Sequence, residues 1–417
     1  MVDNLMTESQ CQFCFNTNLE EIIFLGYYPP VNALVDLSDW NSNQIYFPLQ
    51  LNFCPNCFLV QIGKSLDPKI VFPSSYPYLS GMTKSLISNF ARQAELASKL
   101  LRLEEDDLVV DIASNDGSLL INYQNRARVL GVEPTDTANV AIGNGIPTIK
   151  SYFDRDVVSN ILATEGQAKL ITICNAFAHI PGLNQLIQNI KALLKSDGVF
   201  ISENHYLGSL VETLQFDTIY HEHLRYYSVK FLVNAFKQYD LDIFRVEEID
   251  SHGGSIRVWT CHKGFFQIEE SVGEFIKNEE SETGSAKSLQ NFSSRMISWR
   301  NEFREIISEI REEGEIIIGV GAPSRASTLI GFAGLSELDV LAVAELPGSL
   351  KLNKCMPGTR IPILTESQCL DLAPDVLLIL SWHLGSGLLH SLAQNGFKGR
   401  FLIPLPTPRL VDACDYA

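Results

Sequence analysis

Two pairs of cysteines near the start of the chain most constrain what it can fold into. The pairs are Cys11-Gln12-Phe13-Cys14 and Cys54-Pro55-Asn56-Cys57, and a short β-rich stretch, Leu49-Gln50-Leu51-Asn52-Phe53, precedes the second. A redox Cys-x-x-Cys motif is the alternative, but two such knuckles can each direct two thiolates at one tetrahedral ion, as in a zinc ribbon. We therefore predict an N-terminal zinc-binding domain, residues 1–72, with structural Zn²⁺ on Cys11, Cys14, Cys54 and Cys57. Because four thiolates leave no open coordination position, this metal is assigned to folding and not to catalysis.

Length, charge and hydropathy limit the class of protein. A chain of 417 residues is long enough for two or three domains. Its net charge is −17 and its basic residues are scattered, which argues against a nucleic-acid partner because that affinity comes from clustered Lys and Arg. No run of about 18 apolar residues could span a bilayer, and the first residues lack the basic segment and apolar core of a secretory signal. We therefore expect a cytoplasmic protein with no membrane or nucleic-acid partner.

The pattern in residues 107–134 predicts the ligand-binding edge of a parallel α/β sheet. An apolar strand runs into a polar turn, Ala113-Ser114-Asn115-Asp116-Gly117-Ser118, and a second strand delivers Glu133 at its end. Such turns lie at the carboxyl edge of a sheet, where nucleotide-like ligands bind, and a carboxylate there can accept both hydroxyls of a ribose. A P-loop would need Gly-Lys-Ser/Thr in this turn, and residues 107–134 do not contain it. Two ordinary strands of an α/β sheet are the alternative.

The densest group of proton-transfer side chains lies in residues 216–228. The segment reads Phe-Asp-Thr-Ile-Tyr-His-Glu-His-Leu-Arg-Tyr-Tyr-Ser, and it follows two further predicted strands that bring Asn175 and His179 to the same sheet edge. General acid-base chemistry uses such groups, and His titrates near ~6.5. A polar loop whose rings cluster by chance is the alternative reading. The earlier tyrosines Tyr76 and Tyr78 could equally be core rings or line a cleft.

The last part of the chain predicts a second α/β domain. Residues 266–314 are rich in Glu, Ser and Lys, and we predict a connection there with a solvated helix over residues 288–313. After it, residues 315–328 show a strand, a Gly-rich turn and a helix, with spacing that fits the dinucleotide fingerprint only loosely. The helix N-terminus and Arg325 could hold a phosphate. The predicted domains are therefore 1–72, 73–265 and 266–417.

Together these motifs resemble the three-domain sugar C-methyltransferases, which methylate a ring carbon of nucleotide-linked 4-keto deoxysugars. The resemblance covers almost the full chain, and Asp-Thr-Ile-Tyr-His-Glu-His at 217–223 is its most specific motif. The other motifs are the four cysteines, Gly-x-x-Pro-x-x-Asn ending at Asn32, Ser-Asn-Asp-Gly at 114–117, Gly-Val-Glu-Pro at 131–134, Ala-His-Ile-Pro at 178–181, His-Gly-Gly-Ser-x-Arg at 252–257, Gly-Ala-Pro at 321–323 and Pro-Gly-Thr at 357–359.

The resemblance implies an α/β fold and a methyl donor. It implies a central class I (Rossmann-like) domain that binds S-adenosyl-L-methionine (SAM), between the zinc-binding domain and a C-terminal Rossmann-like α/β domain. The implied cofactor-binding residues are Asp111, Ala113, Ser114, Asn115, Gly117, Glu133, Pro134, Asn175 and Ala176. The implied catalytic residues are His223 as the base, with Tyr220, Glu222, His179, His221 and Tyr76 around the acceptor.

The resemblance also implies a small-molecule acceptor, expected to be a nucleotide sugar, and a monomer or weak homodimer. The implied acceptor-binding residues are Tyr78, Arg257, Pro323, Ser324, Arg325, Arg360, Trp382 and His383. The chain departs from the family at Ala113, where Gly is usual, and at Ser324-Arg325-Ala326-Ser327, Arg360 and His383 in the C-terminal domain. These departures put the identity of the bound acceptor in doubt more than the reaction.

The sequence leaves three alternative functions. A C-methyltransferase with a non-sugar carbon nucleophile would use the same chemistry. A dinucleotide-dependent dehydrogenase or epimerase is disfavoured, because Gly-x-Gly-x-x-Gly does not follow the first strand. A zinc-dependent scaffold with a degenerate methyltransferase domain is the non-enzymatic reading, which Ala113 favours and Glu133 and His223 oppose.

Overall fold

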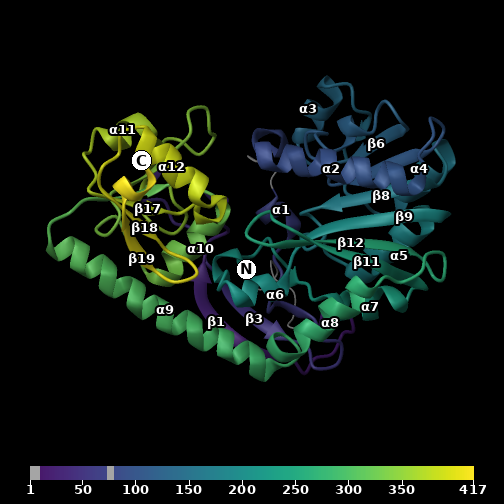
Figure 1. Ribbon diagram of the computed structural model, residues 1–417, viewed down its shortest axis with the longest axis horizontal. Helices are drawn as coiled ribbons and strands as arrows, with labels where there is room; N and C mark the ends of the chain where they lie inside the picture. The colour runs from purple at the N-terminus through teal and green to yellow at the C-terminus, as the bar shows by residue number, and fades with distance from the viewer. Residues whose placement is uncertain (1–9, 73–78) are drawn as a thin grey trace.

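The computed structural model describes residues 10–72 and 79–417, and these residues form three sheets connected by helices. In Figure 1 the seven-stranded sheet lies on the right and the eight-stranded sheet on the left. The long helix α9 (Ala286–Glu312) runs along the lower edge and joins the two parts, and strands of the N-terminal sheet lie between them. The three expected parts of the chain are therefore present.

The N-terminal sheet is antiparallel and has the order β1-β3-β4-β10. Alternate residues of its central strand, among them Phe47, Leu49 and Leu51, are buried, as the two-residue period of a strand requires. The fourth strand comes from the segment 216–228, since Arg225 pairs with Gln61. The strands are β1 (Glu20–Tyr28), β3 (Phe47–Phe53), β4 (Val60–Ile62) and β10 (Arg225–Tyr226). The short helix α1 (Pro68–Val71) follows them.

The middle sheet has the order β11-β12-β9-β8-β5-β6-β7. Strands β5 to β9 are parallel, and β12 and β11 complete the sheet in antiparallel pairs. The carboxyl ends of β5, β6, β8 and β9 therefore meet at one edge. The strands are β5 (Leu108–Ile112), β6 (Arg128–Val132), β7 (Thr148–Ile149), β8 (Ala168–Cys174), β9 (Leu194–His205), β11 (Leu241–Ile249) and β12 (Ser255–His262).

Helices cover both faces of the middle sheet, which confirms the expected Rossmann-like α/β fold. Helix α2 buries Leu86, Phe90 and Ala94 at helical spacing against one face, and α4, α5 and α7 pack on the other. The helices are α2 (Lys84–Leu101), α3 (Thr137–Gly143), α4 (Arg155–Thr164), α5 (Leu183–Leu193), α6 (Leu207–Glu212), α7 (Val229–Lys237) and α8 (Glu270–Glu282).

The C-terminal sheet has the order β19-β18-β17-β13-β14-β16-β15-β2. Its last strand comes from the N-terminal part, since Asp36 pairs with Lys354. The strands are β2 (Val35–Asp36), β13 (Ile317–Val320), β14 (Ala342–Glu345), β15 (Lys354–Cys355), β16 (Pro362–Thr365), β17 (Val376–Ile379), β18 (Arg400–Ile403) and β19 (Arg409–Asp412). Its helices are α10 (Ser324–Ala333), α11 (Glu366–Leu370) and α12 (Ser386–Gln394).

Helix α9 corrects the expectation of a solvated helix over residues 288–313. One face of α9 is polar, but the other buries an apolar stripe that repeats every three or four residues. This stripe shares one core with β1, β3 and α10. The buried stripe consists of Leu289, Phe292, Met296, Trp299, Phe303, Ile307 and Ile310. The helix is therefore part of the core that joins the N-terminal and C-terminal parts. Within residues 10–72 and 79–417, no helix has the length and apolar character needed to cross a membrane.

Candidate active site

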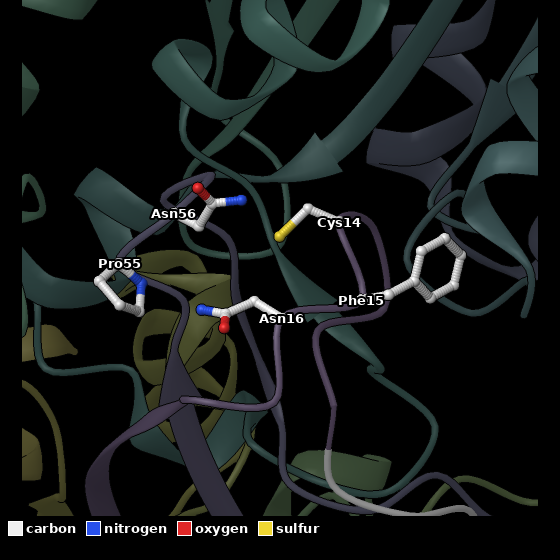
Figure 2. A pocket seen from close by; sticks show the side chains of 5 residues that line it. All are labelled: Cys14, Phe15, Asn16, Pro55 and Asn56. Atoms are coloured by element: carbon white, nitrogen blue, oxygen red, sulfur yellow. The ribbon is translucent and has the colours of Figure 1, made fainter.

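The four cysteines of the two knuckles lie together. Their sulfur atoms are all within 4.8 Å of one another, with 3.4 Å between Cys11 and Cys57 and 3.5 Å between Cys14 and Cys54. Tetrahedral coordination with Zn–S bonds of about 2.3 Å requires sulfurs roughly 3.8 Å apart, so the thiol set fits a structural Zn²⁺. Figure 2 shows the Cys14 thiol turned toward the loop of Pro55 and Asn56, with the Phe15 ring on the other side. In the described part of the chain no other group of side chains has the geometry to hold a metal ion.

The turn after β5 is held in an unusual backbone conformation by Glu133. Ala113 and Asn115 have φ values of 58° and 52°, in the left-handed region that costs a residue with a Cβ about 1–2 kcal/mol. Glu133 Oε2 accepts from Asn115 N at 3.0 Å, and Oε1 accepts from Thr135 N at 2.9 Å. The carboxylate at the end of β6 thus fixes the turn at the end of β5. Thr135 Oγ1 also donates to Oε1, at 2.6 Å, so about one of the roughly four lone-pair positions of the carboxylate stays open for a ribose hydroxyl.

Other residues expected to bind the cofactor lie on the same edge. Asn175, at the end of β8, has a φ of 57°, and its buried Oδ1 lacks a hydrogen-bond partner in the described chain. Asp111 accepts from Thr172 Oγ1 at 2.6 Å, and burial, with the nearby carboxylates of Glu133 and Glu203, raises its pKa to about 7. Left-handed turns, a strand-end carboxylate and an unsatisfied amide oxygen fit a nucleoside ligand such as SAM. Gly117, Pro134 and Ala176 lie in the same turns.

Ser114 does not extend into this edge. Its hydroxyl lies against β6, where a Cβ added to Gly131 would stand 2.5 Å from Ser114 Oγ. Tyr76 and Tyr78 lie outside the described residues. The segment that follows them is fixed to the turn, because Ser80 N donates to Asn115 Oδ1 at 2.9 Å and Gly81 N donates to Asp116 Oδ2 at 2.8 Å.

Four imidazoles and a phenol gather beside the strand ends. The His223 ring centroid lies 4.8 Å from that of His179, 5.1 Å from that of His205 and 4.1 Å from that of Tyr220. His252 lies 5.6 Å from His205. The sequence reasoning chose His223, His179 and Tyr220, but it left out His205 and His252. His205 is the last residue of β9, so the rule that strand ends line the ligand site could have found it.

Burial keeps these imidazoles neutral. It lowers the pKa of His179 and of His252 to about 4, and those of His205 and His223 well below their usual range. Burial also raises the pKa of Tyr220 well above 10, so its hydroxyl stays a hydrogen-bond donor. A neutral imidazole can accept a proton, and a neutral phenol can donate a hydrogen bond, which is the combination needed to form and stabilise an enolate.

One carbonyl oxygen fixes the tautomer of His223. Nδ1 of His223 lies 2.7 Å from the Thr218 carbonyl oxygen, which can only accept. The proton of the neutral ring is therefore on Nδ1, and Nε2 carries the free lone pair. Nε2 of His223 has no hydrogen-bond partner within the described ranges. The same holds for the ring nitrogens of His179, His205 and His252. Nε2 of His223 is thus set up as a proton acceptor.

His221 lies apart from this group, although it was expected to belong to it. Its ring packs against Phe47 of β3, with 6.1 Å between centroids, and its Nε2 lies 3.3 Å from the Pro48 carbonyl oxygen. Burial lowers its pKa to about 4. Neighbouring side chains of an extended segment point to opposite sides, but His221 and His223 are separated by the turn in which His223 N donates to Tyr220 O. The geometry gives His221 a place in the N-terminal core.

Glu222 connects all three parts of the molecule. Asn32 Nδ2 donates to Glu222 Oε1 at 2.7 Å, and Ser324 Oγ, at the start of α10, lies 3.3 Å from Asn32 Oδ1. Lys351 is half-buried nearby and donates to the Ala322 carbonyl at 2.7 Å. Burial lowers the pKa of Lys351, while the charges of Glu345 and Glu222 oppose that shift. Lys351 is not among the predicted site residues, because the sequence around it matches none of the motifs that selected the others.

The arginines expected to bind the acceptor are arranged differently. Arg257 is buried within the middle domain, where it pairs with Glu203 at 2.6 Å and with Asn89 at 2.8 Å. Arg325 is buried too and forms a two-point pair with Asp217. These two guanidinium groups therefore pair with side chains inside the protein, and their role in binding the acceptor stays a prediction.

The remaining C-terminal residues expected to bind the acceptor divide into two places. Arg360 is exposed and lies over the ring of Trp40, 4.2 Å from its centroid. His383 is mostly buried, and burial together with the charge of Arg325 lowers its pKa to about 3. Its Nδ1 has no hydrogen-bond partner in the described part of the chain. Pro323 precedes α10 directly, beside Ser324.

Comparison with known proteins gives three family matches along the chain. Residues 11–72 match a family described as a zinc binding domain, residues 87–246 a methyltransferase domain, and residues 250–406 a C-methyltransferase C-terminal domain. The C-methyltransferase NovU from Streptomyces niveus is 30% identical over 420 residues, which cover 99% of each chain.

Two solved structures resemble part of the chain. An S-adenosylmethionine-dependent methyltransferase from Clostridium acetobutylicum is 15% identical, with a TM-score of 0.35 over 43% of this chain and 92% of its own. Magnesium protoporphyrin IX methyltransferase (ChlM) from Synechocystis with bound SAM is 12% identical, with a TM-score of 0.33 over 42% of this chain and 79% of its own.

Proposed function

Since the chain belongs to the family of SAM-dependent C-methyltransferases that carry an N-terminal zinc-binding domain, we propose that it methylates a carbon next to the ketone of a nucleotide-linked 4-keto deoxysugar. The observation that carries the proposal is the neutral His223 ring, whose Nδ1 proton is held by the Thr218 carbonyl at 2.7 Å. Membership of an enzyme family also sets aside the reading of the chain as a non-catalytic scaffold.

In this proposal His223 is the general base. A proton next to a ketone is too weakly acidic for water to remove at neutral pH, so the site must remove it and stabilise the enolate oxygen at the same time. Nε2 of His223 takes the proton, and the electrons of the C–H bond form the enolate. The Tyr220 hydroxyl, kept protonated by burial, donates a hydrogen bond to the enolate oxygen, with His179 as the alternative donor.

The cofactor residues complete the site. We assign Glu133 to the ribose and the turn 113–117 with Asn175 to the rest of the nucleoside and the methionine part. When bound, SAM supplies an electrophilic methyl group to the carbon nucleophile. The protein contributes position, because bringing donor and acceptor into contact removes much of the entropic cost of the reaction. After transfer, the proton on His223 is released to solvent.

The test is mass spectrometry of the protein incubated with labelled SAM and a panel of TDP- and GDP-linked 4-keto sugars. A gain of one methyl on one sugar supports the proposal, and the position of the label identifies the carbon. The same panel should include free β-keto and phenolic acceptors, because the internal use of Arg257 and Arg325 favours a second candidate, a non-nucleotide carbon acid. Methylation of those compounds alone would overturn the sugar assignment.

The first prediction concerns His223→Asn. We expect methyl transfer to fall by about 10²–10⁴-fold, the usual contribution of a general base, with binding of S-adenosylhomocysteine nearly unchanged in calorimetry. His221→Phe is the matched control, because its ring lies on Phe47 in the N-terminal core. Loss of cofactor binding together with activity in His223→Asn would mean that the residue is structural.

A further inference from the structure

The carboxylate of Asp217 is held entirely by the C-terminal domain. It is fully buried, and Arg325 of α10 donates to both of its oxygens, Nε to Oδ2 at 2.8 Å and Nη2 to Oδ1 at 2.7 Å. Trp382 Nε1 donates to Oδ2 at 2.8 Å. The Trp382 ring also lies under the guanidinium group, with 4.7 Å between the Arg325 Cζ atom and the ring centroid.

The same helix contacts residues on either side of Asp217, the side chain of Gln215 and the backbone of Ile219. Arg325 Nη2 donates to Gln215 Oε1 at 3.1 Å, before Asp217, and Thr328 Oγ1 donates to the Ile219 carbonyl at 3.1 Å, after it. Arg325 Nη1 donates to the His252 carbonyl at 3.0 Å. Four of the five N–H groups of Arg325 are therefore in use, and their partners all lie in the middle domain. A bidentate guanidinium sets the direction of its partner as well as its charge.

Thr218 lies between Asp217 and Ile219. Its carbonyl oxygen accepts the Nδ1 proton of His223, with 2.7 Å between the two heavy atoms. The Tyr226 hydroxyl also donates to this carbonyl, at 3.3 Å. Because the Asp217 side chain and the Ile219 carbonyl are both fixed by α10, the peptide groups of Thr218 cannot rotate without breaking a buried contact. The direction of the Thr218 carbonyl, and with it the tautomer of His223, therefore depends on the C-terminal domain.

We propose that Arg325, Trp382 and Thr328 are positioning residues that hold residues 217–219 so that the Thr218 carbonyl keeps the proton of His223 on Nδ1. This role rests on the proposed function of His223 as the base. It assigns Arg325 to the alignment of the base in place of a phosphate. It also accounts for the burial of this carboxylate, because an isolated buried charge is costly and a two-point pair gives it a single direction.

The group of Asp217, Arg325, Trp382 and Thr328 is called the grip. The test compares variants of the grip with a variant of a residue outside it. Asp217→Asn with Arg325→Gln removes both charges together, so no unpaired charge stays buried, while Trp382→Phe and Thr328→Val each remove one donor. Arg304→Met is the control, because Arg304 binds the carbonyls of Ala333 and Gly334 at the other end of α10. The primary measurement is the ¹⁵N NMR spectrum of histidine-labelled protein, with the His223 signals assigned from His223→Asn.

We expect the wild type and Arg304→Met to show the Nδ1–H tautomer of His223, and the double variant to show a mixture of tautomers. With the acceptor identified from the panel above, kcat of the double variant should fall on the order of 100-fold, with KM for SAM and binding of S-adenosylhomocysteine nearly unchanged. Each single donor variant should lose about tenfold or less, in line with one hydrogen bond. If the double variant does not fold, Trp382→Phe and Thr328→Val are compared with the wild type in its place.

The proposal is overturned if the tautomer of His223 is unchanged in all variants of the grip, or if kcat stays at the wild-type level in all of them. Failure of the proposed function looks different. In that case His223→Asn itself would retain methyl transfer, while the tautomer measurement, which needs no acceptor, would still report whether α10 fixes the His223 ring.

Discussion

The neutral state of His223 is the property on which its proposed chemistry depends. Burial lowers its pKa well below 6.5, and the positive charges of Arg325 and of any protonated neighbour among His179 and His252 act in the same direction, while the bond to the Thr218 carbonyl opposes the shift. The neighbouring imidazoles also have lowered pKa values, so none of them carries a charge near pH 7. At this scale the site is a set of uncharged rings, in which the Thr218 carbonyl places the free lone pair of His223 on Nε2.

The pH dependence of the reaction tests this state. Because the folded-state pKa of His223 lies below its usual value, the base is lost only when the pH falls below about 6.5, the ordinary range of His. We expect kcat/KM to stay constant through neutral pH and to decline on the acid side below that range. An acid limb centred at or above pH 7 would contradict a buried, neutral base.

Sequence reasoning identified many of these residues but not their directions. Spacing after predicted strands selected Glu133, Asn175 and His179 correctly as neighbours of one sheet edge, because strand ends of a parallel sheet always meet there. It placed His221 with His223 around the acceptor, since both belong to one motif, and it could not foresee that His221 packs against Phe47. It also gave Arg325 an open position, because the partner Asp217 lies more than a hundred residues earlier in the chain.

At the scale of elements, the segment 216–228 is held by secondary structure from both other domains. Strand β10 extends the N-terminal sheet beside β4, and α10 packs on the preceding turn. Leu224 N donates to the Ala178 carbonyl, and Arg225 Nη2 donates to the Phe177 carbonyl at 3.1 Å, which fixes the loop that carries His179. The zinc knuckle of Cys54 and Cys57 lies between β3 and β4, so the metal supports the strand on which β10 docks.

Zinc removal should therefore affect the reaction through β4. With a strong chelator we expect metal loss to increase hydrogen exchange at residues 60–62 and 225–226 and to reduce methyl transfer, because ligand binding and folding of such knuckles are coupled. Binding of S-adenosylhomocysteine should be weakened less than methyl transfer, since one face of β5 shares a core with Cys11, Cys54 and Cys57 but its other face packs against α2 in a separate core. Metal-free protein with full activity and unchanged exchange at residues 225–226 would contradict this coupling.

At the scale of the whole molecule, the N-terminal sheet and the C-terminal domain share one hydrophobic core. Tyr28 at the end of β1 packs on Gly331 of α10, and a Cβ at Gly331 would lie 2.4 Å from the ring atom Cε1. Leu329 and Ile330 of α10 belong to the same core as Leu49 and Leu51 of β3. Sequence patterns predicted each sheet, but this sharing escaped them, because strands of two residues such as β2 and β10 leave no periodic signal.

Gly331→Ala tests this contact. Alanine favours a helix over glycine by up to about 1 kcal/mol, but overpacking a core costs about 1–3 kcal/mol, so we expect a net loss of stability. Gly273→Ala in α8 is the control, because its Cβ would meet nothing within 4 Å and should stabilise by about 0.5–1 kcal/mol. Denaturant midpoints measure both. An unchanged or raised midpoint for Gly331→Ala would show that the Tyr28 ring moves aside without cost.

The pairing of β2 with β15 and of β10 with β4 has a practical consequence for engineering acceptor choice. Exchanging only the last third of the chain with that of a relative would leave residues 35–36 and Asp217 facing foreign partners. A functional hybrid would need the zinc-binding domain, residues 216–228 and the C-terminal domain from the same protein. In this molecule the segments that must be exchanged together are those that contact one another, and these segments are not contiguous in the sequence.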